Sequence, residues 1–225
     1  MREVFERQME SLNDQLTQMG KLCVVAIQTA TQALQDGDME TARRVIEADY
    51  EIDQSEKDIE NLCLKLLLEQ QPVARDLRQI SAALKMITDM ERIGDQASDI
   101  AEIIISARMS EATDFPRIEE MSKEASKMVA DSVAAYVDHN QALAEKVMEN
   151  DDVVDRMFAG VRTELVHRIA SLREKDEKSA QHAIDIIMVA KYLERIADHA
   201  TNIAEWVSYS VSGVHKSLSD LKALN

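Results

Sequence analysis

The sequence predicts an all-α protein made of two pseudo-symmetric three-helix bundles, six long helices in all. Only five glycines and two prolines occur among the 225 residues, while residues that favour helices are abundant. Apolar residues recur every three or four positions over long stretches, as they do in amphipathic helices. A motif of fourteen residues also occurs twice, about a hundred residues apart, which indicates an internal duplication.

Three helical patterns follow one another in the first half. Apolar residues repeat at helical spacing from about 4 to 36 and from about 39 to 70, with Asp36-Gly37-Asp38 between the two stretches. Pro72 is well placed to open a third helix, which we expect to reach about residue 108. Residues 109–116 combine small polar residues with the second proline. They predict a domain boundary, with one bundle in residues 1–110 and the other in residues 111–225.

The second half repeats this order of helices. Asp138-His139-Asn140 occupies the place of residues 36–38, and positions in the following helix match at an offset of 102 residues. A charged turn at residues 173–178 takes the place of the proline turn, and the last helix extends toward the small and polar residues that begin at 208. Each half is therefore expected to form an up-down-up bundle.

The overall composition restricts the kinds of partner. The formal net charge of −16 disfavours binding to nucleic acid or to anionic lipid, because no basic stripe offsets it. The first residues lack the apolar core of a signal peptide, and no apolar run is long enough to span a membrane. We therefore expect a cytoplasmic protein without direct membrane insertion. Cys23 and Cys63 lie in apolar helical patterns, which predicts buried free thiols.

The duplicated motif is rich in carboxylates. It reads DMERIGDQASDIAE over residues 89–102 and YLERIADHATNIAE over residues 192–205, with eight identical positions. On a helix, four side chains of each copy fall within about 80°. Like charges four residues apart repel each other, and neither stripe carries Lys or Arg at compensating steps. The repetition favours a bound cation over the alternative of a solvated surface. These side chains are Glu91, Asp95, Asp99 and Glu102, and Glu194, Asp198, Asn202 and Glu205.

The second helix of each half adds a further pair of carboxylates. The pairs are Asp49 with Asp53 and Asp151 with Asp155. If the second and third helices lie side by side, four or more oxygen ligands converge, which suits magnesium, manganese, calcium or iron better than zinc. His199 is at most an accessory ligand. No nucleophile lies beside an evident base, so the sequence predicts neither catalytic residues nor an organic cofactor.

Several of these features together resemble one protein family. They are Gly37-Asp38 at a helix start, Val45 and residues 49–53 within that helix, residues 74–78 after the turn, and the tandem (M/L)ERI(G/A)D motif. Over essentially the whole chain, they resemble the PhoU family of bacterial phosphate-signalling regulators. The resemblance implies a fold of two three-helix bundles, in agreement with the periodicity.

The resemblance also implies a function. The chain would be a cytoplasmic regulator and not an enzyme, a homodimer recruited peripherally to a membrane transporter. It would restrain phosphate uptake and the phosphate-starvation response when phosphate is ample. Its partners would be the ATPase subunit of the phosphate ABC transporter and a PhoR-type sensor histidine kinase.

Metal clusters on each bundle are a further implication of the resemblance. The ions considered are iron, manganese, magnesium or zinc, alone or in multinuclear clusters. Because Asn202 replaces an aspartate, the first half is predicted to hold metal more firmly. Arg75 and Arg78 have no second copy, so they are candidates for a partner contact, with a solvated surface as the alternative. The ligands matched by position are Asp49, Asp53, Glu91, Asp95 and Asp99, and Asp151, Asp155, Glu194, Asp198 and Asn202.

Two alternatives remain open from the residues alone. The chain could be a helical adaptor whose acidic stripes bind a basic partner without metal. It could also be a carboxylate-bridged metalloenzyme, such as an oxidase or a phosphatase.

Overall fold

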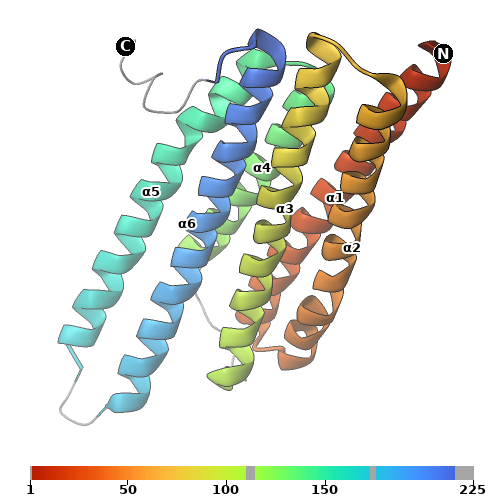
Figure 1. Ribbon diagram of the computed structural model, residues 1–225. Coiled ribbons are helices and arrows are strands. Elements are labelled where there is room, and N and C mark those ends of the chain that lie inside the picture. The colour runs from red at the N-terminus through yellow and green to blue at the C-terminus, as the bar shows by residue number, and fades with distance from the viewer. Residues whose placement is uncertain (1, 110–114, 173–175, 216–225) are drawn as a thin grey trace.

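The computed structural model describes residues 2–109, 115–172 and 176–215 (Figure 1). Its regular elements are all helices, which confirms the predicted all-α fold. Parts of the predicted boundary (110–114), of the charged turn (173–175) and of the C-terminal stretch (216–225) lie outside the described residues. The helices are α1 (Arg2–Asp36), α2 (Met39–Gln70), α3 (Arg75–Ser106), α4 (Pro116–Val137), α5 (Gln141–Ala170) and α6 (Glu177–Ser212).

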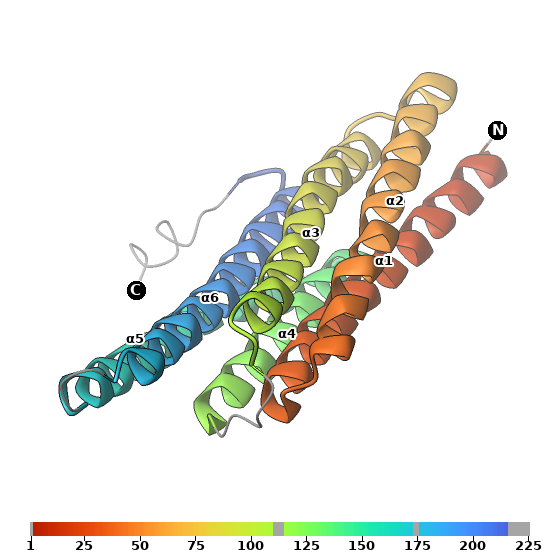
Figure 2. The ribbon, with the colours of Figure 1, turned by 90° about the horizontal axis from the view of Figure 1, so that it is seen from below.

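The three helices of each half pack against one another. The halves meet where α3 contacts α6 and where α1 contacts α4. Helices α5, α6, α3 and α2 follow one another as neighbours in a row, and α4 and α1 cover one side of that row (Figures 1 and 2). The chain direction makes α3 and α6 antiparallel across the seam between the bundles (Figure 1). The acidic motifs of the two halves therefore lie on adjacent helices.

Equivalent turns join the first two helices of each half. Gly37 adopts a left-handed φ of 66°, and the Asp38 side chain accepts hydrogen bonds of 3.0 Å from the backbone N–H groups of Glu40 and Thr41. In the second half His139 has a φ of 52°, and Asn140 caps α5. A left-handed residue followed by a polar cap thus ends one helix and starts the next in both halves.

The turn between α2 and α3 differs from the prediction. Pro72 does not open the third helix, which begins at Arg75. Gln71 and Ala74 both adopt left-handed conformations, with φ of 48° and 50°. The chain therefore reverses over the residues around Pro72 before the helix starts, a geometry that local sequence patterns did not indicate.

One apolar core runs through both bundles and includes residues from all six helices. Cys23 and Cys63 are buried free thiols within it, as predicted. Burial raises the pKa of each thiol to about 12, so both are protonated and unreactive at neutral pH. Within the described residues, no helix combines the length and the apolar character that a membrane span requires.

Candidate metal centres

Carboxylates of α2 and α3 gather on the first bundle, and we call this group the first acidic face. The packing of α2 against α3 brings together the two pairs that the sequence separates by some forty residues. Their mutual repulsion is seen in the pKa values described below. The first acidic face consists of Asp49, Asp53, Glu56, Glu91, Asp95 and Asp99.

Asp49 is the most constrained carboxylate of the first acidic face. Burial, followed by repulsion from Asp95 and Asp53, raises its pKa to about 6. Its Oδ1 atom is buried and has no hydrogen-bond partner among the described residues. A buried carboxylate oxygen without a partner is costly. A cation placed there would satisfy it and would also relieve the repulsion.

Gly94 of α3 makes room for this carboxylate. A Cβ atom at position 94 would lie 2.7 Å from Asp49 Oδ1 and 2.9 Å from Ile52 Cδ1. The absence of a side chain therefore lets α2 lie close to α3 and places Asp49 against the α3 backbone. Ala197 occupies the equivalent position in the second half, so the two faces differ at the point where their helices meet.

Glu91 and Asp95 complete the α3 side of the face. Partial loss of solvent and repulsion from Asp95 raise the pKa of Glu91. For Asp95, partial loss of solvent and Asp53 raise the pKa, while Arg92 and His199 oppose the rise. The α2 and α3 carboxylates are thus close enough to affect one another's ionisation, as the sequence predicted.

Asp99 lies at the edge of the first acidic face. Burial and the neighbouring Glu102 raise its pKa, and a hydrogen bond from the Tyr192 hydroxyl opposes the rise. Tyr192 belongs to α6, so this carboxylate already has a donor in the other bundle. Asp99 therefore contributes both to the face and to the seam between α3 and α6.

The sequence prediction missed Glu56, which extends the face along α2. Burial, Glu60 and Asp53 raise its pKa. The signal was present in the sequence, because Asp49, Asp53, Glu56 and Glu60 follow one another at steps of three or four residues.

The second acidic face consists of Asp151 and Asp155 on α5 and of Glu194 and Asp198 on α6. Asp151 is buried, and its Oδ1 accepts a hydrogen bond of 3.2 Å from Thr201 Oγ1. Asp198 is exposed overall, yet partial loss of solvent, followed by repulsion from Glu194 and Asp151, raises its pKa to about 6. The structure therefore brings together four of the five positions predicted in this half.

A basic side chain lies within the second acidic face, contrary to expectation. Lys191 forms an ion pair with Glu194 one helical turn away, and it also lowers the pKa of Asp198. Thr88 occupies the equivalent position in the first half. We expected neither stripe to carry a compensating base, and that was wrong for the second one. Its negative charge is partly neutralised without any cation.

Asn202, the fifth predicted ligand of the second half, points to the other bundle. Its Nδ2 donates a hydrogen bond of 3.1 Å to Oδ1 of the buried Asp89. His199 Nδ1 lies 2.9 Å from the same oxygen. Both side chains thus contact α3 across the seam. His199, which the sequence suggested at most as an accessory metal ligand, contacts the other bundle in the structure.

The two arginines considered for a partner contact have different surroundings. Arg75 is exposed at the start of α3, so it is accessible to a partner. Arg78 is half-buried beside the end of α6, where a Cβ on Gly213 would lie 3.5 Å from its guanidinium carbon. The structure therefore favours Arg75 for an external contact.

The chemistry of the two faces fits a hard cation, whereas their side chains are not arranged as the ligands of one ion. The donors are carboxylate oxygens, which suit magnesium, manganese or iron, and the Asp49 oxygen lacks a partner. Across residues 2–109, 115–172 and 176–215, however, no three His, Cys, Asp or Glu side chains are placed to hold one ion together. Binding would require the carboxylates to turn, which side chains on a helix surface can do.

Comparison with known proteins gives a consistent result. The PhoU domain family model matches residues 16–104 and again residues 118–207. A Clostridium acetobutylicum protein named phosphate-specific transport system accessory protein PhoU homolog is 35% identical over 221 residues, 97% of this chain and 99% of that protein. An Aquifex aeolicus protein of the same name is 37% identical over 190 residues, 84% of each chain.

Solved structures agree with these sequence matches. The crystal structure of PhoU from Pseudomonas aeruginosa has a TM-score of 0.85 and 33% identity, and it covers 93% of this chain and 100% of that one. The structure of the phosphate transport system regulatory protein PhoU from Streptococcus pneumoniae has a TM-score of 0.84 and 25% identity, with coverage of 95% and 99%. With two matching domains and relatives along nearly its full length, this chain belongs to the PhoU family.

Proposed function

We propose that this chain is an accessory regulator of phosphate transport that restrains phosphate uptake and phosphate-starvation signalling. The observation that carries the proposal is the 35% identity, over 97% of the chain, to a protein named as an accessory of the phosphate-specific transport system. A regulatory role also suits the described surface, which offers extended helix faces and clustered carboxylates.

The finer proposal is that the chain couples the ATPase subunit of a phosphate ABC transporter to a PhoR-type sensor kinase. Two bundles that share one core form a rigid body, so a partner bound to one bundle fixes the position of the other. Such a body can hold two partners near each other at the membrane without entering it. A homodimer in the cytoplasm would present each surface twice.

The two acidic faces are proposed to bind cations, the first more firmly than the second. Asp49, Asp53, Glu91 and Asp95 would hold the ion of the first face, with Asp99 at its edge. Asp151, Asp155 and Asp198 would hold that of the second, where Lys191 already pairs with Glu194. When bound, the cation would neutralise the face and offer open coordination positions to an oxygen ligand of a partner.

A metal-independent adaptor is the second candidate. The observation that favours it is that no three ligating side chains in the described parts of the chain are preset around one point. In that case the first acidic face, with its unpaired Asp49 oxygen, would receive a lysine or an arginine from the partner. A guanidinium could form two parallel hydrogen bonds with one carboxylate.

Affinity purification of the full-length chain from phosphate-replete and phosphate-starved cells tests the proposed coupling. We expect the transporter ATPase and the sensor kinase to be recovered together from replete cells. Absence of both partners under both conditions would contradict the role. Repeating the purification with a chelator separates the two candidates, because partners retained at full yield without metal support the adaptor.

A further inference from the structure

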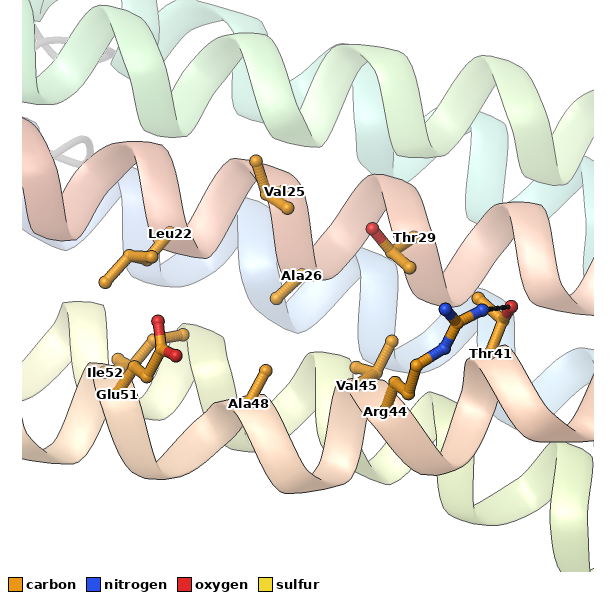
Figure 3. A pocket seen from close by; sticks show the side chains of 10 residues that line it. All are labelled: Leu22, Val25, Ala26, Thr29, Thr41, Arg44, Val45, Ala48, Glu51 and Ile52. Atoms are coloured by element: carbon orange, nitrogen blue, oxygen red, sulfur yellow. Dashed lines mark hydrogen bonds between the residues drawn. The ribbon is translucent and has the colours of Figure 1, made fainter.

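A groove between α1 and α2 is not used by any part of the function proposed above. It has a volume of about 360 Å³ and is lined by residues of α1 and α2 alone, none of which is a predicted metal ligand (Figure 3). Its middle is apolar, with Leu22, Val25 and Ala26 from α1 and Ala48 from α2. Val25 is 58% exposed. An apolar surface left open between two helices is a typical site for a partner helix.

The two ends of the groove carry opposite charges. At one end Arg44 Nη2 donates a hydrogen bond of 2.6 Å to Thr41 Oγ1 (Figure 3). Thr41 in turn donates to the carboxylate of Asp38, so a chain of hydrogen bonds orients the guanidinium at the groove. Glu51 extends from α2 toward Leu22 at the other end (Figure 3). The groove therefore has a basic end, an apolar middle and an acidic end.

The second bundle provides an internal comparison, because its helices α4 and α5 are equivalent to α1 and α2. At an offset of 102, Glu124 and Lys127 replace Leu22 and Val25, and Asn150 replaces Ala48. Asn150 Nδ2 donates a hydrogen bond of 3.1 Å to Glu124 Oε2, from α5 to α4. The same position is thus polar and bridged in the second half, so the bundle itself does not require an apolar groove.

We propose that this groove binds an amphipathic helix of a partner protein. The lining residues span 22–29 on α1 and 41–52 on α2, which corresponds to roughly 10 to 16 Å, or about two to three helical turns. The bound helix presents small aliphatic side chains to Val25 and Ala48, a carboxylate to Arg44 and a basic side chain to Glu51. It completes a four-helix arrangement with the first bundle.

The charges at its two ends define what the groove can bind. Arg44 at one end favours a carboxylate, and Glu51 at the other end favours a basic side chain. A partner helix with charges at both ends matches Arg44 and Glu51 in one orientation only. The groove therefore selects both the class of partner and the direction of its helix.

A photocrosslinking experiment tests the proposal. The full-length chain carries p-benzoylphenylalanine in place of Val25 in cells, and the matched control carries it in place of Lys127, the exposed equivalent on α4. We expect position 25 to capture a segment that has apolar residues at helical spacing, an acid at one end and a base at the other, and position 127 to capture no such segment. Mass spectrometry of the crosslinked peptides identifies the segment.

The captured segment is then synthesised as a peptide and its affinity is measured by fluorescence anisotropy. We expect Arg44→Glu to weaken binding at least tenfold and a peptide with its acid changed to lysine to restore it. Arg44 is exposed, and circular dichroism checks that the variant folds. Capture of a second copy, capture of a segment without this pattern, equal capture at 127 or no capture at all would overturn the proposal.

Discussion

Asn202 of α6 donates a hydrogen bond to Asp89 of α3 across the seam between the two bundles. The offset of 103 residues that relates the duplicated motifs makes Tyr192 the counterpart of Asp89 and Asp99 the counterpart of Asn202. Tyr192 and Asp99 are also hydrogen-bonded. The two pairs are therefore pseudo-symmetric, and each links one acidic motif to the opposite bundle.

The Asp89–Asn202 pair leads to a first prediction, on stability. Asn202→Ala should lower the free energy of unfolding by about 1 kcal/mol, because Asp89 is buried and keeps only its contact with His199. Asn202→Asp should lower it further by placing two carboxylates in contact. Urea denaturation of both variants measures the effect. If Asn202 were instead a metal ligand, Asn202→Asp would increase the amount of metal that the protein binds. That result would contradict the assignment of Asn202 to the seam.

The close approach at Gly94 leads to a second prediction. Gly94→Ala places a Cβ 2.7 Å from Asp49 Oδ1, and such overpacking costs about 1 to 3 kcal/mol. The gain in helix propensity is about 1 kcal/mol, so we expect a net loss of up to about 2 kcal/mol. The control Ala197→Gly relieves no clash, and it should lose helix propensity together with the packing of one buried methyl group. A Gly94→Ala variant more stable than the natural chain would show that α2 does not lie so close.

The raised pKa values of Asp49 and Asp198, each about 6, give a third prediction, on pH. These carboxyls bind protons more readily in the folded chain than in the unfolded one, where the pKa is near 3.8. In metal-free buffer the free energy of unfolding should therefore rise as the pH falls from about 7 toward 4. Partial exposure limits each contribution to the order of 1 kcal/mol.

A variant separates this effect from general titration. Asp49→Asn should stabilise the metal-free chain at pH 7 by about 1 kcal/mol and flatten the pH profile. Asp14→Asn, outside both acidic faces, should leave the profile unchanged. Thermal unfolding between pH 4 and pH 7 measures both variants, and an unaltered profile for Asp49→Asn would contradict the account of this carboxyl.

The asymmetry of the two acidic faces gives a fourth prediction, on metal binding. Manganese titrated into metal-free protein should bind tightly at the first face and more weakly at the second, where Lys191 pairs with Glu194. Asp95→Ala should abolish the tight phase of the calorimetric titration, while Asp198→Ala should retain it. Lys191→Ala should strengthen the weak phase. Equal losses in Asp95→Ala and Asp198→Ala would show that the two faces do not differ.

The sequence indicated the helices and the acidic faces because both depend on short spacing. A carboxylate at every third or fourth position defines a stripe whatever the tertiary structure is, and Asp49 and Asp95 meet because consecutive helices pack together. The position of Asn202 depends instead on how α6 lies against α3, a contact between residues more than a hundred positions apart. The open groove likewise depends on which side of α1 and α2 remains uncovered, and Pro72 shows that the backbone of a turn is not set by one residue.

Phosphate uptake measured in cells tests the proposed regulation most directly. In a strain from which the gene for this chain is deleted, uptake of labelled phosphate in phosphate-replete medium should be high. The natural chain should restore low uptake, whereas a chain with Asp49→Ala and Asp95→Ala should do so incompletely. Uptake that is the same with and without the natural chain would contradict the proposed role.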